Sequence, residues 1–105
     1  NCCEIDAIDD TVKLVDAAKR LMDGRVFCTF GCHPGNYKEY DDDNEARLIE
    51  ALEACGDKAV GWGECGLDYA KGLDSDDPGS REQMLRVFAR QADIAVSRRL
   101  PLVVH

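Results

Sequence analysis

Three apolar segments recur along the chain, and segments with apolar residues at helical spacing lie between them. The apolar runs cover residues 26–32, 59–65 and 100–104, which is the length expected of strands. They do not alternate apolar with polar residues, a pattern typical of strands that are covered on both faces. The chain is therefore predicted to contain three buried strands.

Each apolar run follows a segment that is predicted to be an amphipathic helix. The first helix extends from Asp10, as its N-cap, to Gly24, and the second lies between Asp43, which precedes it, and Gly56, which follows it. The third begins at Ser80, which has the capping-box spacing to Gln83. Helices and strands that alternate along a chain predict an α/β fold with a parallel sheet and right-handed crossovers.

The remaining segments indicate no second domain. Residues 1–5 are predicted to be the tail of an earlier strand, and residues 72–80 an exposed loop. The chain has 105 residues, enough for one domain at most, and its 45% apolar content excludes a disordered chain. No apolar run approaches the roughly 18 residues that a membrane span needs. Trp62 is expected to lie in the core, and the alternative is a stacking platform for a base.

The net charge of −8 limits the kinds of ligand that the chain is expected to bind. An acidic chain is not expected to bind nucleic acid through a broad basic face, although a contact to phosphates through metal ions stays open. The six cysteines are too few for a disulfide scaffold; three of them lie in the apolar segments, and Cys55 lies on the apolar face of the second predicted helix. They are predicted to be reduced, which indicates a reducing compartment, cytoplasmic or nuclear.

Chemistry-bearing residues gather where the predicted strands end. His33 follows the first strand, Glu64 lies within the second run, and His105 follows the third. In parallel α/β folds the functional residues collect at such ends, and imidazole with carboxylate suits a divalent metal ion. Each residue also has a simpler interpretation: Glu64 paired with an arginine, His33 filling a turn, and His105 exposed as a terminal residue.

Two motifs and the segment that follows them resemble the TatD family of metal-dependent deoxyribonucleases. The first motif is Gly-Cys-His-Pro at residues 31–34, and the second is Gly-Glu-Cys-Gly-Leu-Asp-Tyr at residues 63–69. Residues 83–105 continue the resemblance with Gln83, a Val-Phe pair, an Ile-Ala pair and a final Pro-Leu-Val-Val-His. The order and spacing agree over most of the chain.

The resemblance implies a fold and a set of roles. The fold is a TIM-type (β/α)₈ barrel, of which residues 1–105 form a central fragment of about three β/α units, roughly strands three to five. Glu64 and His105 match metal ligands, with Glu64 often bridging two ions. His33 matches a catalytic-site histidine that meets the substrate, and Asp68 an acidic residue that orients a ligand or loop.

The activity implied is metal-dependent hydrolysis of DNA phosphodiester bonds, with two divalent ions (Mg, Mn or Zn) as cofactors and DNA as the substrate. The family's His-x-His ligand pair is absent from the chain, so the fragment alone is expected to be inactive. Two alternatives stay open: hydrolysis of another ester or amide, such as that of aminoacyl-tRNA, and a non-catalytic barrel fragment. Neither a membrane nor an obligatory protein partner is expected.

Overall fold

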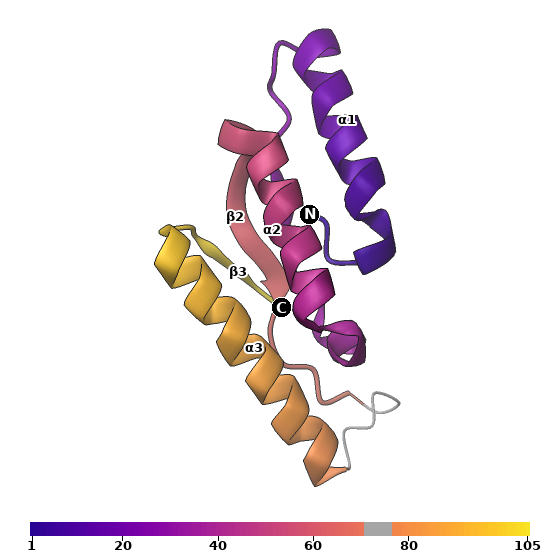
Figure 1. The fold of residues 1–105 in the computed structure, drawn as a ribbon, viewed down its shortest axis with the longest axis vertical. Coiled ribbons are helices and arrows are strands. Elements are labelled where there is room, and N and C mark those ends of the chain that lie inside the picture. The colour runs from indigo at the N-terminus through magenta and orange to yellow at the C-terminus, as the bar shows by residue number, and fades with distance from the viewer. Residues whose placement is uncertain (71–76) are drawn as a thin grey trace.

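A computed structural model describes residues 1–70 and 77–105 of the chain. Helices alternate with strands, and the three strands form one parallel sheet in the order β1-β2-β3 (Figure 1). The helices are α1 (Ile8–Leu21), α2 (Asp42–Cys55) and α3 (Pro78–Arg98), the strands are β1 (Cys28–Phe30), β2 (Ala59–Cys65) and β3 (Leu102–Val104), and the 3₁₀ turns are η1 (Ile5–Ala7), η2 (Pro34–Glu39) and η3 (Gly56–Lys58). The predicted α/β class and parallel sheet are confirmed.

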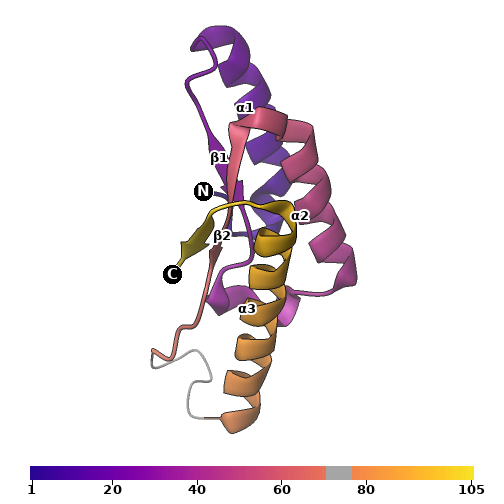
Figure 2. The ribbon, with the colours of Figure 1, turned by 90° about the vertical axis from the view of Figure 1, so that its left-hand side faces the viewer.

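The three helices lie on one side of the sheet, as Figure 2 shows. On the other side the sheet carries small side chains: a methyl group on Gly61 would lie 3.2 Å from Cγ2 of Thr29 and 3.5 Å from Cγ2 of Val103. Thr29 and Val103 are only half-buried there. Within residues 1–70 and 77–105 the helices pack on one face of the sheet alone, so the expectation that the strands are covered on both faces is met there for one face.

The strand ends differ from the prediction where tertiary contacts replace the sheet. The second strand has the predicted bounds, but β1 ends at Phe30 instead of residue 32. Beyond Phe30, the amide of Gly31 donates to Cys2 O (3.1 Å) and the amide of Cys32 to a side chain of α3. The third strand starts at Leu102 because Pro101 has no amide hydrogen to donate.

The first residues of the chain lie beside β1. Cys2 forms a parallel bridge with Phe30, and its amide donates to Thr29 O at 2.9 Å. The amide of His33 donates to Cys3 O at 3.1 Å, which extends the same ladder. These contacts confirm that the segment before η1 pairs with the sheet as a short strand-like extension.

The three helices are confirmed, but their predicted N-caps are wrong. The first helix begins at Ile8, two residues before Asp10, because the 3₁₀ turn η1 leads directly into it. The second is capped by Asp41, whose side chain accepts from the amide of Asn44 at 2.8 Å. Asp43 thus lies inside the helix. Among neighbouring aspartates, the backbone path decides which one caps.

The third helix is capped by Asp77 and not by Ser80. The side chain of Asp77 accepts from the amide and the hydroxyl of Ser80, both at 2.9 Å. Pro78 takes the first helical position, where its missing amide hydrogen costs nothing. The loop predicted for residues 72–80 lies in part outside the described residues, and from Pro78 onward it is helix.

Two glycines follow helices as predicted, at different distances. Gly56 caps α2 with a φ of 58°, a conformation that favours glycine. The first helix already ends at Leu21, so Gly24, with a φ of 64°, lies beyond the cap. All six cysteines are free, as predicted. No helix among residues 1–70 and 77–105 is long and apolar enough to cross a membrane.

A buried amide joins α3 to two strands. Gln91 is 1% exposed, and its Oε1 accepts from Cys32 N at 2.8 Å and from Trp62 Nε1 at 3.2 Å. Its Nε2 donates to Cys32 O at 3.1 Å. Trp62 is fully buried, which confirms its place in the core. The side chain of Gln91 therefore satisfies both backbone groups of Cys32 where β1 leaves the sheet.

We expect Gln91→Leu to lower the free energy of unfolding by about 3 kcal/mol or more. The substitution leaves three buried polar groups without a partner, and each costs roughly 1–3 kcal/mol. Urea-induced unfolding measures the difference. Gln83→Leu is the matched control, because Gln83 lies on the same helix and is exposed; it should change the free energy by less than about 0.5 kcal/mol. Equal losses in both variants would contradict the assignment.

Candidate metal centre

Three side chains with metal-ligating atoms meet at the carboxyl edge of the sheet. His33 follows β1, Glu64 is the penultimate residue of β2, and His105 follows β3. One ligand atom from each lies within 4.8 Å of the others. Because parallel strands end at the same edge, residues far apart in the sequence converge there. The structure thus brings together the three residues that the sequence predicted at strand ends.

Glycine allows the strands to approach closely beside this cluster. Gly63 has a φ of 136°, and a methyl group on it would lie 2.3 Å from Val103 O. A methyl group on Gly31 would lie 2.6 Å from Cα of Gly63. No side chain fits at either position without a shift of the backbone. The glycine before Glu64 therefore lets β2 carry the carboxylate close to β3.

His105 lies between two carboxylates. Its Nδ1 is 2.5 Å from Glu64 Oε1, and its Nε2 is 3.4 Å from Asp68 Oδ2. The hydrogen bond to Glu64 raises the pKa of His105, and Asp68 adds to this effect against the opposing effect of desolvation. The same hydrogen bond lowers the pKa of Glu64. Without a metal ion, a protonated imidazole between two carboxylates satisfies both contacts.

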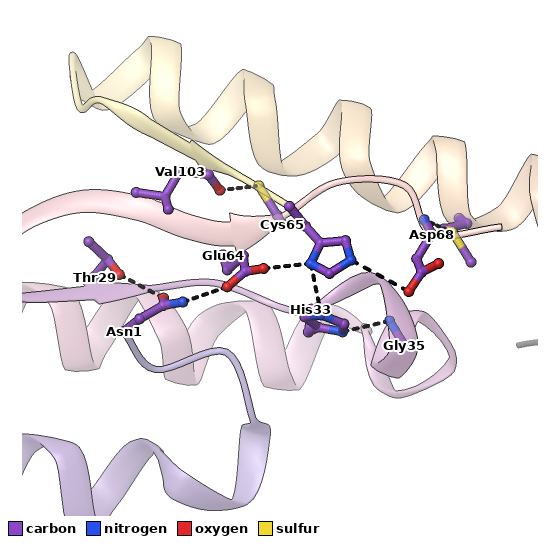
Figure 3. A network of polar contacts seen from close by, with 10 residues as sticks. Asn1, Thr29, His33, Gly35, Glu64, Cys65, Asp68 and Val103 are labelled. Carbon is purple, nitrogen blue, oxygen red and sulfur yellow. Dashed lines mark hydrogen bonds and ion pairs between the residues drawn. The ribbon is translucent and has the colours of Figure 1, made fainter. Parts of the chain in front are cut away.

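His33 has one of its ring nitrogens committed to the backbone. The amide of Gly35 donates to His33 Nδ1 at 2.9 Å (Figure 3). An amide can only donate, so Nδ1 must hold a lone pair, and a neutral His33 carries its hydrogen on Nε2. That Nε2 lies 3.1 Å from His105 Nδ1. His33 therefore presents a hydrogen-bond donor, and not a lone pair, to the centre of the cluster.

No placement of protons satisfies every contact of His105 Nδ1. The Nε2–H of His33 requires a lone pair on this nitrogen, whereas an ionised Glu64 at 2.5 Å requires a hydrogen on it. One ring nitrogen offers only one of the two. A cation that binds both Nδ1 of His105 and the carboxylate of Glu64 removes the conflict between these two groups, because neither then needs a hydrogen between them.

This donor set fits a divalent ion. Asp68 Oδ2 pairs with Nε2 of His105 at 3.4 Å, which favours a hydrogen on Nε2 and leaves Nδ1 available to a metal; a carboxylate behind a ligating histidine is a common arrangement at metal centres. Glu64 Oε1 supplies the second ligand beside it. The structure thus places His33, Glu64 and His105 together with Asp68 beside His105, and the hydrogen bond from Gly35 distinguishes His33 from the other two.

Two further residues at the site carry no signal in the sequence. Asn1 Nδ2 donates to Glu64 Oε2 at 2.8 Å, and Thr29 Oγ1 donates to Asn1 Oδ1 at 2.8 Å. Neither residue belongs to the motifs at the strand ends. The interpretation of Glu64 as the partner of an arginine is not borne out, because its partners are His105 and Asn1.

The imidazole and carboxylate groups at the carboxyl edge of this parallel α/β sheet could hold a metal ion, at the place where α/β enzymes carry their functional residues. The family described as TatD related DNase matches residues 2–105, so the chain belongs to the TatD family, which is metal-dependent. The chain is also similar to a human protein named 3'-5' RNA nuclease TATDN2, with 39% identity over 85 residues. The match covers 81% of this chain and spans 10% of that protein.

We expect the pKa of His105 to lie above its ordinary value in the metal-free protein, and to fall in Glu64→Gln. The neutral amide no longer favours the imidazolium, so the main cause of the raised pKa is removed. NMR titration of isotope-labelled histidine measures both values. Because protons and metal compete for Nδ1, metal affinity should increase as the pH rises through the pKa of His105. A pKa that is the same in both proteins would contradict the pairing.

Proposed function

We propose that this chain supplies part of the active site of a metal-dependent nuclease. The observation that carries the proposal is the facing pair of Glu64 Oε1 and His105 Nδ1, with Asp68 behind the imidazole. Membership of the TatD family supports the activity. Glu64 and His105 would hold a divalent ion, and a second ion would need ligands from elsewhere in the protein.

The bound ion would supply Lewis-acid stabilisation of charge on the phosphate and a more acidic water. Glu64 and His105 would hold it as an ionised carboxylate and a neutral imidazole, and Asp68 would keep the hydrogen of His105 on Nε2. The net charge of −8 explains why such chemistry runs through cations, because the chain as a whole repels a polyanion.

His33 would act on the substrate. Gly35 keeps the hydrogen of His33 on Nε2, which points toward the pair of ligands. A donor in this position is suited to a phosphate oxygen held next to the ion, where it adds a hydrogen bond to developing negative charge. We therefore assign His33 to the phosphodiester and not to the metal.

The substrate we propose is RNA, because the human relative named as an RNA nuclease matches most of this chain. DNA is the second candidate, which the description of the family favours.

One face of the described sheet carries no helices. We propose that further strands complete this sheet to a (β/α)₈ barrel, to which this chain contributes a central part. The free cysteines support a cytoplasmic or nuclear location.

Glu64→Gln and His33→Ala should separate metal binding from substrate contact in the complete protein. Glu64→Gln removes a charged ligand, so we expect Mn²⁺ binding to weaken and metal-dependent cleavage to fall by at least about 100-fold. His33→Ala should reduce cleavage by about 100-fold and leave the Mn²⁺ affinity within about twofold. Calorimetric titration and cleavage of a labelled oligonucleotide measure the two effects.

Glu50→Gln is the matched control, because Glu50 is exposed on α2. It should leave both measurements unchanged. Unchanged turnover in Glu64→Gln would overturn the proposed function, and a large loss of Mn²⁺ affinity in His33→Ala would place that histidine among the ligands.

RNA and DNA can be compared directly as substrates. We expect single-stranded RNA to be cleaved at least about tenfold faster than DNA of the same sequence in the presence of Mn²⁺. Glu64→Gln is the control for contaminating ribonuclease and should cleave neither. Faster cleavage of DNA would reverse the order of the two candidates, and hydrolysis of aminoacyl-tRNA alone would contradict both.

A further inference from the structure

The two oxygens of Glu64 have different partners. Oε1 faces Nδ1 of His105 at 2.5 Å, whereas Oε2 accepts a hydrogen bond from Nδ2 of Asn1 at 2.8 Å. Asn1 also accepts from the hydroxyl of Thr29, whose Oγ1 is 2.8 Å from Asn1 Oδ1 (Figure 3). A chain of two hydrogen bonds therefore leads from β1 to the carboxylate on β2.

The donors and acceptors along these two hydrogen bonds can be assigned in only one way. An ionised carboxylate can only accept, so the end of the Asn1 amide that faces Glu64 must be the NH₂ group. The amide oxygen then faces Thr29, whose hydroxyl can donate to it. Turning the amide over would bring an oxygen to 2.8 Å from Oε2, which like charges disfavour.

The backbone holds Asn1 in this place. Cys2 pairs with Phe30, and its amide donates to Thr29 O at 2.9 Å. These bonds keep the segment that begins at Asn1 alongside β1, on the side opposite to β2. Thr29 is in register with Gly61 of β2, two residues before the cis peptide bond that joins Gly63 to Glu64.

We propose that Asn1 is a positioning residue for Glu64 and that Thr29 orients its amide. By holding Oε2, Asn1 turns Oε1 toward the side on which His105 presents Nδ1. Glu64 then offers Oε1 to a divalent ion beside Nδ1, while Oε2 accepts from Asn1. This inference rests on the proposed function and concerns the orientation of the carboxylate, because an oxygen with two lone pairs can accept a hydrogen bond and still bind an ion.

The proposal can be tested by Mn²⁺ binding to the complete protein, measured by calorimetry without substrate. We expect Asn1→Ala and Thr29→Val to weaken Mn²⁺ binding by about tenfold, since partners behind a metal ligand typically contribute 10- to 100-fold. Thr29→Ser keeps the hydroxyl and should stay within about twofold of the natural protein. Thr11→Val is the matched control, because Thr11 lies in α1, away from the strand ends.

Thermal unfolding without metal separates positioning from a structural role. Asn1→Ala should leave the Tm within about 2 °C while the Mn²⁺ affinity falls; if Thr29→Val does not fold, Asn1→Ala alone decides. An unchanged or tighter affinity in Asn1→Ala would overturn the proposal. A loss in Thr29→Ser equal to that in Thr29→Val would overturn the role of the hydroxyl. If the natural protein binds no Mn²⁺, the proposed function fails instead.

Discussion

Parallel pairing of β1, β2 and β3 is the constraint on which the rest of the structure depends. Parallel neighbours need a crossover between them, and here helices make it, so α2 and α3 pack against the sheet. The same pairing places all three carboxyl ends at one edge, where His33, Glu64 and His105 meet. Gln91 maintains this arrangement from inside the core by binding both backbone groups of Cys32, directly before His33.

As long as no cation is bound, a proton on His105 balances the negative charge of the carboxylates at the site. Glu64 and Asp68 both face His105, and together they favour the imidazolium, so a proton holds the place between ring and carboxylate. A divalent ion can replace that proton because the same lone pairs serve it. His33 takes no part in this exchange of a proton for a metal ion, because the amide of Gly35 fixes its tautomer. Under the proposed function, the chain would combine two ligands with one fixed hydrogen-bond donor, an arrangement that suits a charged substrate at a metal ion.

Much of the fold was predictable because its elements have strong local patterns. The apolar run 59–65 became β2 with the predicted bounds, and all three helices lie near their predicted places. The errors are of two kinds. Caps were misplaced where several capping residues lie close together, as with Asp41 and Asp43 or Asp77 and Ser80, because only the backbone path selects one. Strand β1 is shorter than its apolar run because Cys2 and Gln91 take its later backbone groups.

The sequence by itself determined the class of fold, the family and the residues that carry the chemistry, because these follow from residue type and from spacing along the chain. The tertiary structure decided which atom of each residue acts. Gly35 fixed the hydrogen of His33, Asp68 the free nitrogen of His105, and Asn1 the free oxygen of Glu64. The last two contacts join residues 37 and 63 positions apart. They depend on strand register and loop geometry, which no local pattern encodes.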